Sequence, residues 1–211
     1  MKRAAELLTA MEQEKSGRLP RYESPNSGAL LRRLAAEDNL GMYRNLSIPL
    51  EQRMPDALTY INSANRILKL YLEAYNRGEA TGSELVELIG GHLRTSEQMV
   101  RLTDELLPTL DPKDPTYATR IGGLDKMKGG LANVVAGALT SLTEAAAYRP
   151  GDLKRLAGSM EATFPGIVPA LPEASRTETL VRLRSFIDDP KMQEFKPELE
   201  RTLQAVDTPA K

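Results

Sequence analysis

The side chains that could do chemistry are few, and histidine comes first. His92 is the only histidine in the 211 residues, and the chain has no cysteine. A single histidine cannot build a histidine-rich metal site, and without cysteine there is no thiolate catalysis, disulfide or cysteine-bound zinc. His92 follows Gly90 and Gly91 and flanks an apolar helical stripe, which is typical of a partly buried structural histidine rather than a general base. We therefore predict no catalytic residue, no metal site and no cofactor.

A second group of polar side chains lies on the segment 50–77. Amide, cationic and aromatic groups beside an apolar stripe can line a small-molecule site. One hypothesis therefore assigns ligand binding to Asn65, Arg66, Tyr71 and His92, in a cavity between the segments 50–77 and 115–147. The alternative interpretation is that helix ends and solvated faces account for these side chains.

Sequence motifs and charge exclude several classes of protein. The stretch GGLDKMKGG at 122–130 resembles a phosphate cradle, but it has neither a preceding strand nor the spacing of a phosphate loop. The chain carries 28 basic and 29 acidic residues, so it lacks the basic footprint of a nucleic-acid-binding protein. No apolar run approaches the roughly 20 residues that a membrane span needs. We expect no nucleic-acid partner and no membrane span.

The apolar periodicity predicts an all-α fold. Tryptophan is absent and aromatic residues make up 5% of the chain, so the core must come from aliphatic side chains that suit packed helices. Short connections, including the proline-rich turn near residue 110, make neighbouring helices antiparallel. The prediction is an antiparallel helical bundle with shorter N- and C-terminal helices around three long core helices, over about 50–77, 83–107 and 115–147. The first long helix is expected to carry Pro55 in its opening turn, and its inward stripe is expected to be Leu58, Ile61, Ala64, Ile67 or Leu68, Tyr71 and Tyr75. The inward face of the second is expected to be Val86, Ile89, Leu93, Ser96, Val100, Thr103 and Leu107.

The same pattern divides the chain into three parts. Residues 1–26 are predicted to form an N-terminal helix and a polar linker, residues 27–150 the bundle core, and residues 151–211 a C-terminal helical segment packed on the bundle. Within the last part, a short helix is expected to end near residue 162, because Pro165 and the prolines after it oppose a continuous helix.

The third long segment is unusually rich in glycine. Gly123, Gly130 and Gly137 are seven residues apart and form one column along the helix, although each interior glycine costs about 1 kcal/mol relative to alanine. Antiparallel pairing about the turn near residue 110 places Gly90 opposite Gly130. We therefore expect a central helix gripped from several sides through close backbone contact. The alternative is an open glycine ridge that faces a cavity or a partner.

The remaining candidate site is the first helix. Leu7, Leu8 and Met11 give it an apolar face on an element tethered by a polar linker. Three destinations stay open for this face: its own bundle, a neighbouring copy, or the groove of a partner. The leading functional prediction is a non-catalytic helical interaction protein, a scaffold or adaptor, with a protein partner or self-association. The alternative is a small-molecule-binding bundle or an unrecognised enzyme. A chain without cysteine suits the cytosol and an exported protein equally, so the compartment stays open.

Overall fold

The computed structural model describes residues 40–78, 82–143, 148–149 and 151–207, and within them every regular element is a helix. The predicted all-α class is therefore confirmed for this part of the chain. The long elements are α4 (Leu50–Asn76), α5 (Gly82–Leu106), α6 (Tyr117–Ser141), α7 (Asp152–Ile167), α8 (Glu173–Asp188) and α9 (Lys196–Asp207). Short 3-10 helices are η1 (Met42–Arg44), η2 (Leu107–Thr109), η4 (Val168–Ala170) and η5 (Pro190–Phe195).

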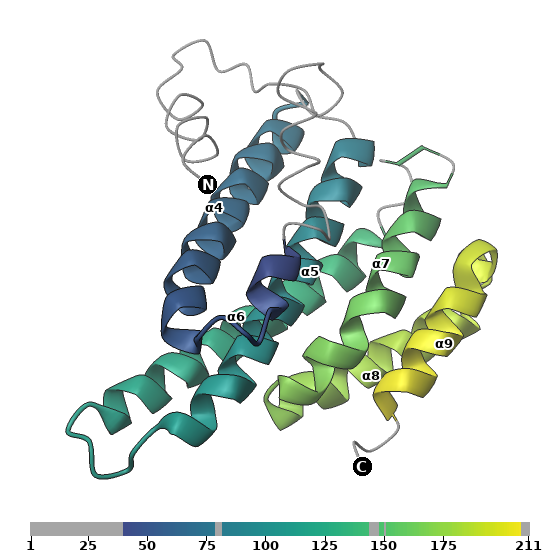
Figure 1. Ribbon diagram of the computed structural model, residues 1–211. Helices are drawn as coiled ribbons and strands as arrows, with labels where there is room; N and C mark the ends of the chain where they lie inside the picture. The colour runs from purple at the N-terminus through teal and green to yellow at the C-terminus, as the bar shows by residue number, and fades with distance from the viewer. Residues whose placement is uncertain (1–39, 79–81, 144–147, 150, 208–211) are drawn as a thin grey trace.

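The helices pack in a row with two further helices behind it. α5 has extensive contacts with α4 on one side and α7 on the other, and α7 in turn packs against α9 (Figure 1). α6 and α8 lie behind this row, where α6 contacts α5, α7 and α8. α4 therefore stands at one end of the row, and its extensive contacts among the described elements are with α5 and η1.

The central helix is α5, whose sides are covered all the way round. Residues 88–91 are buried without interruption, and four successive residues go once around a helix. The predicted inward face is confirmed at Val86, Ile89, Leu93, Ser96, Val100 and Thr103, whereas Leu107 lies beyond the helix and is 38% exposed.

The prediction that the glycine-rich helix is central is wrong. Only Leu131, Val135, Ala138 and Leu139 are buried on α6. A Cβ atom on Gly130 would meet no described atom within 4 Å, and the same holds for the other α6 glycines.

The predicted pairing of Gly90 with Gly130 is wrong as well. A Cβ atom on Gly90 would lie 2.9 Å from Ser159 Oγ, so this glycine allows α5 to approach α7 and not α6. The physical reason is that burying the aliphatic stripe of α6 removes more apolar surface from water than a glycine contact would, and this sets the rotation of the helix.

Prolines interrupt the helices less than the sequence suggests. α7 continues through Pro165 to Ile167, five residues past the predicted end. Phe164 and Ile167 are fully buried, and two such side chains stabilise the structure by about 3–6 kcal/mol, which offsets the roughly 3 kcal/mol that an interior proline costs. Pro55 lies in the second turn of α4, not in its opening turn as expected.

The apolar side chains form two clusters. The larger joins α5 to α6, α7, α8 and α9, with Leu93, Val135, Phe164, Leu183 and Leu199 among its members. The smaller lies where α4 meets α5 and consists of Leu40, Tyr43, Ala57, Tyr60, Ile61 and Leu102. The predicted division into three parts stays a prediction, and the N-terminal helix expected within residues 1–26 lies outside the described residues.

Candidate functional site

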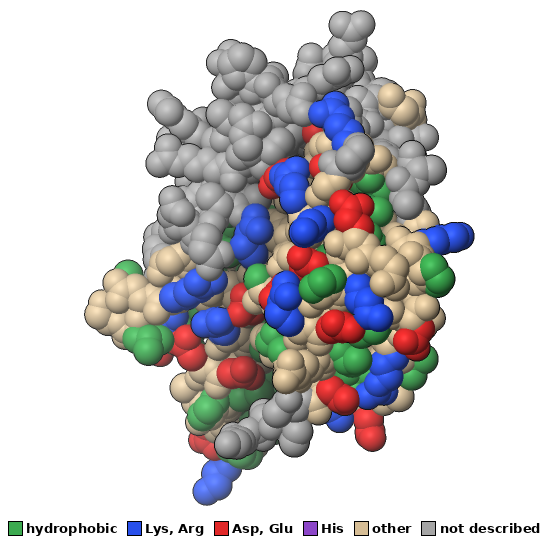
Figure 2. Space-filling view, turned by 90° about the vertical axis from the view of Figure 1, so that its right-hand side faces the viewer, with side chains coloured by type: hydrophobic (Ala, Val, Ile, Leu, Met, Phe, Trp, Pro, Cys, Tyr) green, Lys and Arg blue, Asp and Glu red, His purple; other side chains and the backbone are tan. Residues whose placement is uncertain are grey.

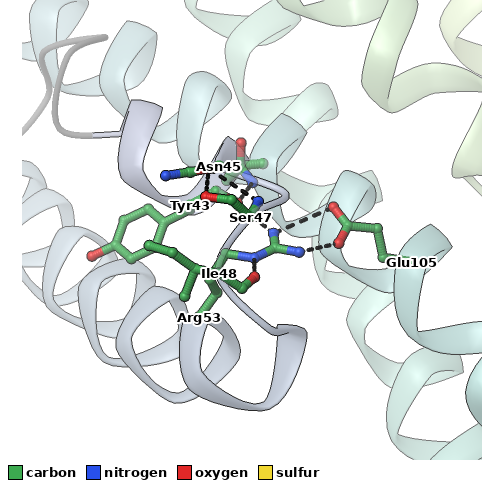
Figure 3. Close-up of polar contacts among 7 residues, drawn as sticks. Tyr43, Asn45, Ser47, Ile48, Arg53 and Glu105 are labelled. Carbon is green, nitrogen blue, oxygen red and sulfur yellow. Dashed lines mark hydrogen bonds and ion pairs between the residues drawn. The ribbon is translucent and has the colours of Figure 1, made fainter.

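The most elaborate polar arrangement is the Arg53 clamp at the start of α4. The Arg53 side chain is 4% exposed, donates to Tyr43 O and to Ile48 O at 2.7 Å each, and pairs with Glu105 Oε2 of α5 at 2.5 Å (Figure 3). Gln98 of α5 also donates to Tyr43 O, at 3.4 Å. Since the guanidinium satisfies buried backbone carbonyls and one carboxylate, the clamp holds η1 and the following turn against α4 and α5. This cluster is structural.

Next to the clamp, Tyr60 packs its ring 5.7 Å from that of Tyr43. The Tyr60 hydroxyl is buried and has no hydrogen-bond partner. Burial, with a smaller contribution from Tyr43, raises the pKa of Tyr60 to about 12, so the phenol stays neutral. A neutral, enclosed phenol is a packing group and not an acid or base for catalysis.

His92 lies on α5 and its Nδ1 atom is buried without a hydrogen-bond partner. Burial lowers the pKa of His92 to about 4, because a charged imidazolium would be poorly solvated there. The imidazole is therefore neutral at pH 7 and, as predicted, only partly buried. Its structural role stays a prediction.

The four predicted ligand-binding residues are not brought together in a described groove. Asn65 and Arg66 are exposed on α4, whereas His92 is partly buried on α5, with its Nδ1 atom enclosed. The side chain of Tyr71 lies outside the described part. The hypothesis of a cavity shared by these residues stays a prediction.

Two grooves are described, and both lie elsewhere. One, with a volume of about 360 Å³, runs between α5 and α7 over Gly90 and Gly158. The ion pair of Glu87 with Arg155 spans it, and Arg155 also reaches Asp152 at 3.3 Å. The other, of about 100 Å³, lies between α6 and α8, where Arg182 donates to Ala136 O at 3.3 Å. Arg155 and Arg182 thus each join two helices at the groove that they line.

The charged surface is also internally paired. On the face shown in Figure 2, basic and acidic side chains are interspersed. Arg201 pairs with Glu161 at 2.6 Å and Arg184 with Asp207 at 2.8 Å, which joins α9 to α7 and to α8. The hydrogen bond from Arg201 is the main cause that lowers the pKa of Glu161 below its usual value.

One surface feature was missed by the sequence analysis, which had placed Leu58 among the inward residues of α4. The structure buries Ile61 as predicted, together with Ala57 and Tyr60, but leaves Leu58 39% exposed. Leu72, two heptads later, is 46% exposed, and Asn65 between them is exposed too. We call Leu58, Asn65 and Leu72 the α4 column. The seven-residue spacing can be read from the sequence, but whether Leu58 faces α5 or solvent cannot.

Among the described residues, no group of histidine, aspartate and glutamate side chains is arranged to hold a metal ion. No helix in the described part is both long enough and apolar enough to cross a membrane. The predicted partner-binding residues Leu7, Leu8 and Met11 lie outside the described residues. No protein-family model, curated protein or solved structure matches the chain.

Proposed function

We propose that this protein is a helical interaction protein, a scaffold or adaptor, that presents the α4 column to a partner helix. The observation that carries the proposal is the pair of leucines, Leu58 and Leu72, exposed seven residues on either side of Asn65 on a helix at the end of the row. Apolar side chains at such heptad positions are how amphipathic helices dock with one another.

The rest of the molecule supports α4 as a rigid carrier. The Arg53 clamp fixes its first turns to α5, and the small cluster around Tyr60 packs beneath it. We propose a bundle in which α4, α5 and α7 form the supporting layer. The ligand-binding alternative stays a prediction, and neither described groove is lined by Asn65, Arg66 or His92.

Site-specific photo-crosslinking in the source cells tests the function. A photoreactive residue at position 65 is expected to give an adduct of one defined mass, whose partner is then identified by peptide sequencing. The control is the same residue at position 133, which is an exposed asparagine on α6.

Two matched variants sharpen the experiment. Leu58→Glu combined with Leu72→Glu is expected to abolish the adduct, because it places charges in the proposed contact. Leu46→Glu, at a leucine that is 75% exposed but lies off the column, is expected to leave it unchanged. No adduct at position 65, or equal adducts at positions 65 and 133, would show that the α4 column is not a binding surface.

A further inference from the structure

The residue types of the α4 column are arranged symmetrically along the helix. Leu58 and Leu72 each lie seven residues from Asn65, so the column reads Leu, Asn, Leu in either direction along the helix. At a rise of about 1.5 Å per residue, the two leucines are about 21 Å apart with the asparagine midway. An antiparallel copy of α4 therefore presents the same residue types at the same heights.

From this symmetry we infer that the partner of the α4 column is a second copy of this chain, paired antiparallel about a two-fold axis at Asn65. The inference rests on the proposed function and names its partner. In this arrangement Leu58 of one protomer packs against the partner's Leu72, Leu72 packs against the partner's Leu58, and the two Asn65 side chains meet at the axis. Such isologous contacts are the usual form of a homodimer.

The polar flank of the column fits the same axis. Asn62 and Lys69 are both exposed on the side of α4 away from the buried Ala57. In an antiparallel pair, residues on the same side of the line of contact face each other across it. Lys69 therefore lies beside the partner's Asn62, and the two lysines stay apart. The lysine ammonium can then donate to the amide oxygen, once on each side of the axis.

Asn65 also has a role in this interface. A polar residue at one seam position fixes the register of paired helices, because any slip sets its amide against a leucine. Two amides facing each other each donate and accept one hydrogen bond. The asparagine thereby selects the alignment in which both leucine contacts form.

Because the chain has no cysteine, single introduced cysteines report the geometry without background. Asn65→Cys is expected to form a disulfide-linked dimer under mild oxidation, since the two Cα atoms at the axis come within the roughly 7 Å that a disulfide allows. Leu58→Cys alone and Leu72→Cys alone are expected to form no disulfide under the same conditions, because antiparallel pairing sets identical positions far apart. A mixture of these two variants is expected to give the mixed dimer.

A second measurement covers variants that alter the contact itself. Sedimentation equilibrium of the unmodified chain is expected to show a monomer–dimer equilibrium. Leu58→Glu with Leu72→Glu is expected to weaken it at least tenfold, while Leu46→Glu is not. Circular dichroism of each variant confirms that the helices are intact.

Each other outcome overturns the inference. Homodimers of Leu58→Cys and of Leu72→Cys would show parallel pairing. A protein that stays monomeric, with no disulfide at position 65, would mean that the column has another occupant or none. The photo-crosslinking adduct then separates these cases: a different protein attached at position 65 keeps the proposed function and rejects self-pairing, and no adduct rejects both.

Discussion

At the scale of single residues, the burial of His92 makes the free energy of unfolding depend on pH. Its pKa is about 4 in the folded protein and about 6.5 in an unfolded chain. Below pH 6.5 the unfolded state therefore binds a proton that the folded state does not, so the free energy of unfolding falls as the pH drops from 6.5 to 4. Above pH 6.5 the His92 contribution is constant.

The expected size of this loss is about 3 kcal/mol between pH 6.5 and pH 4. Urea unfolding at pH 7, 5.5 and 4 measures it, and His92→Gln is the control, because glutamine does not titrate in this range. The difference between the two proteins should change over the interval. A constant difference would show that His92 is protonated equally well in the folded and unfolded states.

Arg53 gives a second prediction at this scale. Arg53→Met leaves Ile48 O without its side-chain donor, leaves Tyr43 O with only the longer hydrogen bond from Gln98, and leaves Glu105 without its partner. We expect unfolding by urea to show a loss of about 3 kcal/mol.

Glu105→Gln is the matched change on the other side of the clamp. The Glu105 side chain is 31% exposed, and glutamine can still accept from Arg53, so the expected loss is only about 1 kcal/mol. Equal losses for the two variants would show that the ion pair, and not the carbonyl contacts, holds the clamp.

At the scale of elements, the glycines of α5 and α6 have different surroundings. Gly130 on α6 is exposed and open, so Gly130→Ala is expected to raise the free energy of unfolding by about 1 kcal/mol through helix propensity alone. Gly90→Ala gains the same propensity but places a Cβ atom 2.9 Å from Ser159 Oγ, so we expect net destabilisation. Thermal and urea unfolding of both variants measure these opposite signs. A destabilising Gly130→Ala would mean that the face of α6 is covered.

The sequence was most informative about the helices and their buried faces. The spacing of Val86, Ile89 and Leu93 predicted the buried face of α5, because a 3.6-residue period can be read without knowing the neighbour. The rotation of α6 could not be read in this way, since its glycines and its aliphatic residues favour different faces. Which face of α6 is buried depends on its contacts with α5, α7 and α8 together. The alignment of α6 with one neighbouring helix does not determine it.

The candidate site was less predictable than the fold. Asn65 was identified as functional, but as a ligand-binding residue with His92, and the structure places the two in different surroundings. Leu58 was assigned to the core because it fits a helical stripe. Leu58 lies at the edge of the stripe that faces α5. Only the packing against α5 decides whether its side chain is buried or exposed.

At the scale of the whole molecule, the two apolar clusters predict unequal local stability. α4 is held by the small cluster and the Arg53 clamp, whereas α5 and α7 share the larger cluster. Native-state hydrogen exchange is expected to show the amides of residues 56–70 opening at lower free energy than those of residues 156–164. Equal opening free energies would mean that the described helices unfold as one unit.

The row of helices also has a consequence for synthesis. α5 is flanked by α4, which precedes it in the chain, and by α7, which follows only after α6. Since a ribosome adds about 5–20 residues per second, the face of α5 that will meet α7, which includes Val86 and Gly90, stays uncovered for several seconds. That interval is when a nascent-chain chaperone has its clearest target.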